Sequence, residues 1–155
     1  MRFLIGVFLV IFTDQISKIW VQNNVNLMES IPIIKGIFHI TYIQNPYSAF
    51  GLLKLHNNIF IIVALLVILV IIFLLRNKLN ETNKLVFFAF IFILGGSMGN
   101  MIDRLRVGSV IDFLDFRIWP IFNIADSAIN IGLLFLLIHF LFKKEEEKQE
   151  DRLKD

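Results

Sequence analysis

Two aspartates in the stretch "GSVIDFLDFRIWPIFNIAD" (108–126) are the residues whose setting best suits chemistry. Asp112 and Asp126 each stand among Ile, Phe and Leu, with no adjacent cation. Two buried carboxylates that lie close together cannot both ionise easily, so one keeps its proton while the other loses it. The ionised member can take a proton from water and the protonated member can polarise a carbonyl. The sequence therefore predicts an aspartate dyad formed by Asp112 and Asp126.

Other kinds of reactive site find little support in the sequence. The chain has no cysteine, which removes disulfides, thiolate nucleophiles and cysteine metal ligands together. His39, His56 and His139 stand alone, without the spacing of a metal-binding pair. Ser17 and Lys18 are neighbours, and neighbours on a helix do not face each other as a Ser/Lys dyad would. We therefore expect no metal site and no cofactor.

Two further charged pairs have structural explanations. Asp14 and Lys18 have the i, i+4 spacing of an ion pair on one helix face, and such a pair can simply hold helices together in a membrane. Asp103 and Arg104 are interpreted as interfacial anchors at the end of a span.

The elements that must position these residues are membrane spans. The chain of 155 residues is 57% hydrophobic and contains 17 phenylalanines, and its mean hydropathy is +0.74. A soluble fold would have to expose much of this apolar surface, so a membrane protein is the better class. The net charge of +2 is small and no basic stripe interleaves with aromatic residues, so a nucleic-acid partner is not expected.

Four segments have the length and composition of transmembrane helices, which need about 20 mostly apolar residues. They cover about residues 3–21, 57–75, 85–102 and 122–142, and a charged tail follows at 143–155. A cleaved signal peptide is the alternative for the first segment, but "TDQISKIW" offers no small-residue cleavage site. We expect one domain over residues 1–155 and a monomer.

Between the first two spans the chain is broken by Pro32, Gly36, Pro46 and Gly51. The segment "GIFHITYI" is short, β-branched and aromatic, which is typical of a strand. The predicted fold is thus mainly α and integral to the membrane. It has four transmembrane helices and a small extracytoplasmic β-cradle between helices 1 and 2.

An even number of spans puts both termini on one side of the membrane. The lysines and arginines that flank the spans are evenly divided between the two sides, so Arg2 and the pair Lys143 and Lys144 decide in favour of cytoplasmic termini. A helix rises 1.5 Å per residue, which places Asp14 about 17 Å and Lys18 about 23 Å from the start of the first span. The charged groups of all the spans therefore converge near one face, predicted to be extracytoplasmic.

With these residues in hand, the chain resembles the type II (lipoprotein) signal peptidases, which are bacterial membrane aspartyl peptidases. The resemblance covers nearly the whole chain and is carried by four blocks in order: "TDQISK" (13–18), "QNPYSAFG" (44–51), "GGSMGNMIDRLRVGSVIDF" (95–113) and "FNIADSAI" (122–129). Tyr47 stands where the family usually has glycine, and Gln44 stands where arginine is frequent. Asp115 falls outside the blocks and is interpreted as a solvated loop residue.

The resemblance implies a fuller set of site residues. Asp112 and Asp126 match the catalytic dyad of the family. The positions that match substrate-binding or dyad-supporting residues are Asp14, Lys18, Asn45, Gly99, Asn100, Asp103, Arg104, Asn123 and Ala125. The glycines at 95, 96 and 99 also allow close approach of a neighbouring helix or a lipid.

The resemblance also implies the reaction and the location. The enzyme would be an aspartic endopeptidase of the bacterial inner or cytoplasmic membrane. It would remove the signal peptide from diacylglyceryl-modified prolipoproteins by cutting before the lipidated cysteine, with membrane lipid as its surroundings. Two alternatives stay open. A small ion-coupled transporter subunit would use the same carboxylates as a proton relay, and an assembly factor would perform no chemistry.

Overall fold

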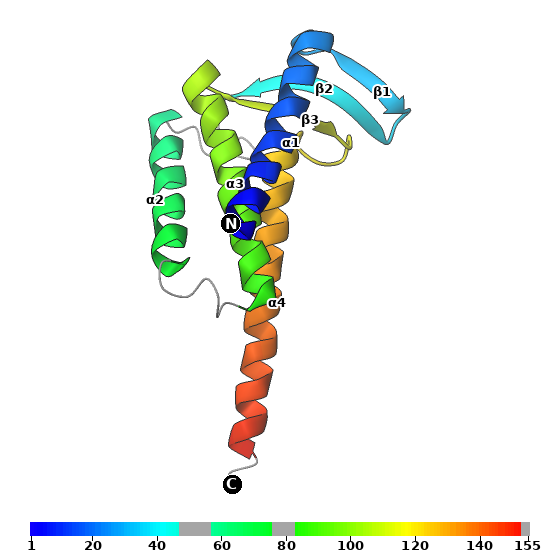
Figure 1. Ribbon diagram of the computed structural model, residues 1–155. Helices are drawn as coiled ribbons and strands as arrows, with labels where there is room; N and C mark the ends of the chain where they lie inside the picture. Colours follow the sequence, from blue (N-terminus) through cyan, green and yellow to red (C-terminus); the bar gives the residue numbers. More distant parts are fainter. Residues whose placement is uncertain (47–56, 76–82, 153–155) are drawn as a thin grey trace.

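The computed structural model describes residues 1–46, 57–75 and 83–152, with the backbone alone for residues 144–152. The interpretations of Tyr47, Gly51 and His56 concern positions outside these residues. The described elements are α1 (Arg2–Asn24), β1 (Ser30–Ile34), β2 (Phe38–Asn45), α2 (Asn57–Leu75), α3 (Lys84–Val107), β3 (Val110–Asp115) and α4 (Ile124–Arg152). Figure 1 shows the helices side by side, with the strands at one end of the bundle.

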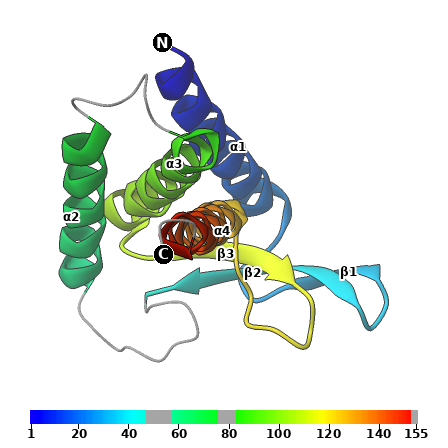
Figure 2. The same cartoon turned by 90° about the horizontal axis from the view of Figure 1, so that it is seen from below.

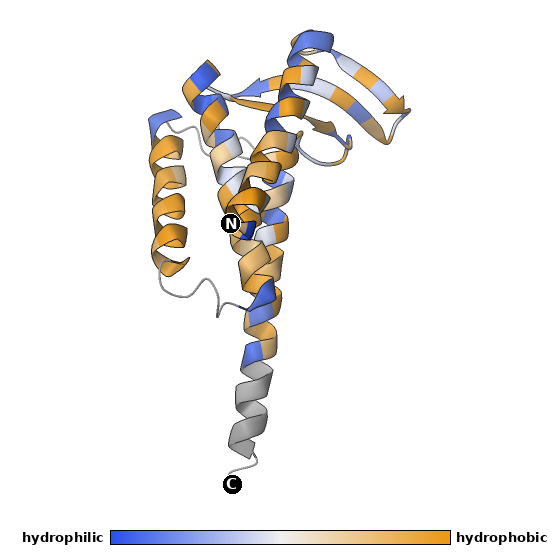
Figure 3. Cartoon of the chain, in the orientation of Figure 1, coloured by the Kyte–Doolittle hydropathy of each residue, from blue (hydrophilic) through white to orange (hydrophobic). Residues whose placement is uncertain are grey.

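The predicted fold class is confirmed. Each of the four helices is long and apolar enough to cross a membrane: Arg2–Asn24, Asn57–Leu75, Lys84–Val107 and Ile124–Lys143. Figure 3 shows that apolar residues dominate the helices, whereas hydrophilic residues gather where α1 and α3 approach the strands. The charged and polar groups therefore lie mainly at the sheet end of the bundle.

Helix α3 is the centre of the bundle, because it contacts α1, α2 and α4 (Figure 2). Its glycines permit these contacts. A Cβ atom on Gly95 would lie 2.6 Å from the Cβ of Val10 on α1, and one on Gly96 would collide with the carbonyl oxygen of Ala125 on α4. The glycine stripe therefore serves close helix packing on two sides, as the sequence predicts.

The three strands form one antiparallel sheet in the order β1-β2-β3. The predicted strand "GIFHITYI" corresponds to β2. Its partner β3 comes from a distant part of the chain, with Ile43 opposite Asp112 and Asn45 opposite Val110. Asp112 therefore lies in a strand, which the sequence analysis did not predict. Almost every residue of β3 is buried, so the strand lacks the alternation that would have identified it from the sequence.

A short excursion after β3 is closed at its base by backbone hydrogen bonds. The amides of Phe113 and Leu114 donate to the carbonyl oxygen of Phe122 at 3.0 and 2.8 Å, and the amide of Phe122 donates back to Leu114 at 3.2 Å. Residues 116–121 therefore project as a hairpin loop beside the start of α4. This loop lies directly between the two predicted dyad aspartates in the chain.

Candidate active site

Asp126 is fixed by the way in which α4 begins. Asn123 precedes the helix, and its Oδ1 accepts the backbone N–H of Asp126 at 2.8 Å. In return, the Oδ2 of Asp126 accepts the backbone N–H of Asn123 at 3.3 Å. This reciprocal arrangement is a capping box, which satisfies two N–H groups that the first turn leaves without helical partners. The sequence Asn-Ile-Ala-Asp thus both starts α4 and orients a carboxylate.

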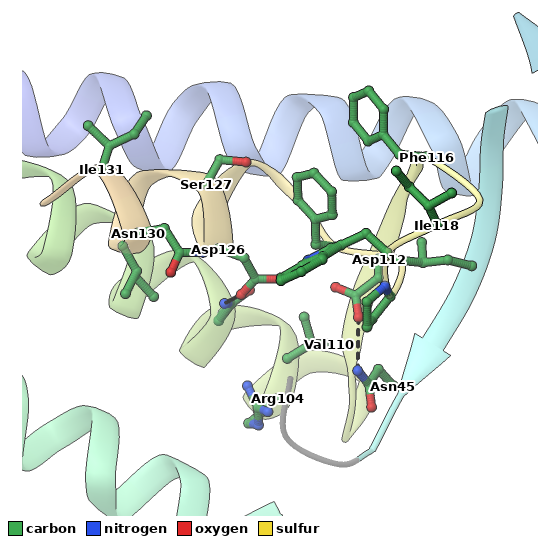
Figure 4. Close-up of a pocket in the computed structure, with 16 residues that line it drawn as sticks. Asn45, Arg104, Val110, Asp112, Phe116, Ile118, Asp126, Ser127, Asn130 and Ile131 are labelled. Atoms are coloured by element: carbon green, nitrogen blue, oxygen red, sulfur yellow. Dashed lines mark hydrogen bonds between the residues drawn. The ribbon is translucent and has the colours of Figure 1, made fainter. Parts of the chain in front are cut away.

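Asp112 reaches the same place from β3. Its Oδ1 accepts the side-chain N–H of Asn123 at 2.7 Å, and its Oδ2 accepts that of Asn45, on β2, at 3.0 Å (Figure 4). The Asp112 residue is only 2% exposed. The antiparallel pairing of β2 and β3 is what brings Asn45 to this carboxylate.

Asn123 therefore connects the two aspartates, and it is itself fully buried. Asn100, on α3, adds a second amide: its Nδ2 donates to the Oδ1 of Asp126 at 2.8 Å, and its Oδ1 accepts from Asn123 at 3.1 Å. Within the described ranges, neither Asp112 nor Asp126 has a cationic nitrogen within 4.0 Å. Neutral amides hold both carboxylates, so neither is locked into its charged form by an ion pair.

The environment of Asp112 favours its protonated form. Burial, and after it the nearby charge of Asp126, raise the pKa of Asp112 from 3.8 to about 7. The hydrogen bonds from Asn45 and Asn123 and the more distant charge of Lys18 oppose this shift without cancelling it. Asp112 is therefore suited to carry a proton near neutral pH, as the acid member of a dyad must.

A second carboxylate cluster lies beneath the dyad and is organised around Lys18. The ammonium group of Lys18 lies 2.8 Å from the Oδ2 of Asp14 and 2.8 Å from the Oδ2 of Asp103, and it donates to the Oδ1 of Asn100 at 3.0 Å. Lys18 therefore makes two hydrogen bonds, to Asp14 and Asn100, and an ion pair with Asp103. Asp14, Lys18 and Asp103 are fully buried.

The predicted pairing of Asp14 with Lys18 is thus present, but the interpretation of Asp103 as an interfacial anchor is wrong. Burial of a lysine so far along α1 requires a compensating charge from another helix, and Asp103 supplies it from α3. Asp103 also accepts the backbone N–H of Ile111 at 3.2 Å. The cluster therefore ties α1, α3 and β3 together.

The remaining predicted supporting residues, Ala125, Gly99 and Arg104, lie around the Lys18 cluster and the two dyad aspartates. The Oδ1 of Asp14 accepts the backbone N–H of Ala125 at 2.9 Å, which fixes the first turn of α4 to α1. Gly99 makes room for this contact, because a Cβ atom there would lie 2.5 Å from the Oδ2 of Asp14. The guanidinium of Arg104 lies 4.8 Å from the ring centre of Phe60, on α2.

The dyad aspartates open onto a cavity of about 810 Å³. Its polar lining comes from two helices and two strands: Asn45, Asn100, Arg104, Asp112, Asp126, Ser127 and Asn130. Its apolar lining includes Val110, Ile129 and Ile131 and most of the hairpin loop, from Phe116 to Phe122. Figure 4 shows this loop beside Asp112 and Asp126. A cavity of this size accommodates an extended peptide segment or an acyl chain next to two carboxylates.

Two features of the site were missed by the sequence analysis. The loop 116–121 contributes much of the apolar wall, but the sequence analysis gave this segment no role. Asn130 lines the cavity but stands one residue beyond the last matched block. A polar residue within a span, four residues after Asp126, was the signal that could have found it.

The interpretation of Asp115 as a solvated loop residue is also wrong. Asp115 ends β3 and is only 4% exposed. Its Oδ2 accepts the hydroxyl of Thr41 at 2.7 Å and lies 3.0 Å from the guanidinium of Arg117, while its Oδ1 accepts the backbone N–H of Arg117 at 2.8 Å. Burial alone would raise the pKa of Asp115, but these donors outweigh it and lower the pKa below its ordinary value. This carboxylate fixes the start of the hairpin loop.

The part of the chain that the structure describes contains no cluster of metal-binding side chains. No group of three or more His, Cys, Asp or Glu side chains there has a geometry that could hold a metal ion.

Comparison with known proteins gives a consistent picture. The sequence matches the family of signal peptidase (SPase) II over residues 6–142. It is 43% identical to the lipoprotein signal peptidase of Moorella thermoacetica over 150 residues, covering 97% of this chain and 99% of that protein. It is 44% identical to the lipoprotein signal peptidase of Halothermothrix orenii, covering 92% and 96% of the two chains.

Solved structures give the same result for the fold. One, described as a bacterial membrane enzyme determined by the in meso method at 2.3 Å, matches with a TM-score of 0.87 and 27% identity, covering 94% of this chain and 90% of the other. A second bacterial membrane enzyme, at 1.9 Å, matches with a TM-score of 0.81 and 28% identity. The likeness therefore extends over the whole arrangement of helices and sheet.

Proposed function

The chain belongs to the signal peptidase II family, and we propose that it removes the signal peptides of diacylglyceryl-modified prolipoproteins as a bacterial, multi-pass membrane aspartyl protease that cuts before the lipidated cysteine. One observation carries the mechanism: Asn123 bonds to both Asp112 and Asp126, and these carboxylates line one cavity with neutral amides as their hydrogen-bond partners. Two such carboxylates can share a proton, which carboxylates neutralised by a lysine cannot do as readily.

In the proposed reaction, Asp126 is the base and Asp112 is the acid. Asp126 receives two N–H donors at the N-terminal end of α4, where the helix dipole suits an ionised carboxylate. It takes a proton from water, whose oxygen then bonds to the scissile carbonyl carbon, while Asp112 donates its proton to the carbonyl oxygen. Asp126 then gives the proton it took from water to the amine nitrogen, and the C–N bond breaks. Asp112 takes a proton back from a hydroxyl of the tetrahedral intermediate, so the dyad returns to its starting state.

The proposed orientation puts both termini in the cytoplasm and the dyad near the extracytoplasmic face. The dyad lies at the sheet end of the bundle, where α3 ends and α4 begins. A signal peptide crosses the membrane with its cleavage site near that face. The apolar cavity wall formed by the loop 116–121 suits acyl chains, and each buried methylene contributes about 0.8 kcal/mol.

The test is cleavage of a diacylglyceryl-modified prolipoprotein by the purified protein in detergent. We expect Asp112→Asn and Asp126→Asn each to reduce turnover by about 10⁴-fold or to background, because Asn keeps the shape but cannot exchange a proton. Asp115→Asn is the matched control on the same strand and should retain turnover within about tenfold. Near wild-type turnover in either dyad variant would rule out the proposed mechanism.

The substrate's lipid is tested in the same assay. An unlipidated prolipoprotein at equal concentration should be cut with a much lower kcat/KM than the diacylglyceryl form. Comparable kcat/KM values for the two substrates would mean that the lipid is not recognised, and the protein would then be a general signal-peptide protease.

A further inference from the structure

Asn130 is a polar residue in an apolar span, and nothing in the fold accounts for it. It lies on α4, within the membrane-capable segment Ile124–Lys143. The side chain is exposed, and no hydrogen bond joins its carboxamide to another residue in the part of the chain that the structure describes. Neighbouring exposed residues of α4 are apolar, among them Ile131, Leu133 and Leu134. Polar residues at such depth are costly and usually serve a function.

The position of Asn130 relative to the dyad is specific. It follows Asp126 by four residues, so the two side chains lie on one face of α4 and about 6 Å apart along the helix axis. Both line the 810 Å³ cavity, and Figure 4 shows Asn130 beside Asp126 on the same helix. Because α4 runs away from the sheet end, Asn130 lies deeper in the membrane-capable region than the dyad does.

A substrate cleaved at the dyad has backbone groups at the depth of Asn130 that need hydrogen-bond partners. Cleavage requires an extended peptide at the scissile bond, and an extended segment has lost the hydrogen bonds of a helix. Each unpaired N–H or C=O group in a lipid environment costs several kcal/mol. The segment just before the scissile bond leads back into the membrane, and so passes the level of Asn130.

Resting on the proposed function, we propose that Asn130 is a substrate-binding residue that hydrogen-bonds a backbone peptide group of the signal peptide, on the N-terminal side of the scissile bond. A carboxamide carries both a donor and an acceptor, so it can pair with the C=O and the N–H of one peptide unit. This binding is independent of the side chains of the signal peptide and suits an enzyme that processes many sequences. An ester carbonyl of the substrate's lipid could accept one hydrogen bond but could donate none.

The experiment compares wild type, Asn130→Leu and Asn130→Gln in the cleavage assay, with Leu134→Ala as a control one helical turn further along the same face of α4, outside the cavity lining. Leucine matches asparagine in size and suits the membrane, so folding should be kept. We expect Asn130→Leu to raise KM between about three- and tenfold with kcat unchanged, the value of one lost hydrogen bond. The KM of Asn130→Gln should lie closer to that of wild type, and the KM of Leu134→Ala should equal that of wild type.

Two further measurements separate this proposal from its rivals. The Asn130→Leu effect should be equally large for diacylglyceryl and unlipidated substrates, because both contain the peptide group. If the effect vanishes with the unlipidated substrate, the partner is an ester carbonyl and the proposal is wrong. The thermal midpoint in detergent should be unchanged, so a lowered midpoint with a parallel loss of kcat would show a structural role instead. If wild type cleaves the substrate and Asn130→Leu has the same kcat and KM, this inference is overturned and the proposed function remains intact.

Discussion

Two groups of aspartates lie at the sheet end of this bundle, and they differ in what surrounds their charge. Asp14 and Asp103 contact the ammonium of Lys18 at 2.8 Å and are sealed from solvent. Asp112 and Asp126 accept hydrogen bonds from neutral amides and line a cavity. The first arrangement holds helices together, whereas the second leaves protons free to move. The two groups therefore differ in the donors that hold their carboxylates, and this difference supports the proposal that Asp112 and Asp126 form the catalytic pair.

The two groups are also connected. Asn100 accepts from Lys18 and donates to Asp126, so one side chain joins the structural cluster to the proposed dyad. Substitutions that remove charge from one group at a time test whether the two groups have these different roles.

The largest effect is expected for Lys18→Met, which leaves two carboxylates buried without their cation. Loss of one partner from a buried ion pair costs about 3–5 kcal/mol of unfolding free energy. Asp14→Asn combined with Lys18→Met should remain unstable, because Asp103 is still unpaired. The triple variant that adds Asp103→Asn should recover much of the loss. Thermal unfolding in one detergent measures all three, and equal stability of the double and triple variants would contradict the role of Asp103.

A smaller effect is expected for Asp112→Asn. This substitution should stabilise the protein, unlike Lys18→Met, and the gain should depend on pH. The pKa of Asp112 in the folded protein, about 7, lies above its ordinary value of 3.8. Its contribution to stability is therefore complete below about pH 4 and is lost as the pH rises through 7. The loss is on the order of 4 kcal/mol at alkaline pH, as an upper estimate. Asp112→Asn should remove this loss.

The measurement for this second prediction is the difference in thermal midpoint between wild type and Asp112→Asn at pH 5 and pH 8. The variant should gain on wild type as the pH rises. A difference that does not change with pH would show that Asp112 does not titrate in this range, and would remove the argument that it carries the proton.

The smallest effect is expected at Asp115, which belongs to neither group. Its main charged partner, Arg117, is half exposed, so the ion pair itself contributes little. Asp115→Asn should cost about 1 kcal/mol, mainly through the weakened hydrogen bond from Thr41. Because the pKa of Asp115 is lowered, this contribution is present above about pH 4 and is lost as the pH falls further. Melts at pH 7 and pH 3 check it: a cost that is equal at both values would contradict this explanation.

The membrane fold and the main candidate site residues could be predicted from local properties of the sequence. Helix length and apolar composition are local properties, so four spans could be assigned without any contact information. The i, i+4 spacing of Asp14 and Lys18 is likewise a property of one helix, and their pairing follows from it. Asp112 and Asp126 stood out because a carboxylate without an adjacent cation is rare in apolar sequence.

Only the tertiary structure decided which charges meet across elements. Asp103 reaches Lys18 because α1 and α3 pack closely at Gly95 and Gly99, and no local spacing encodes that contact. Asp112 lies in a strand because β2 supplies hydrogen bonds from some 65 residues away, whereas its own buried sequence has no strand alternation. Asn123 joins the dyad because the hairpin loop returns the chain to the start of α4. These contacts depend on long-range packing, which sets the environment of each carboxylate and hence its role.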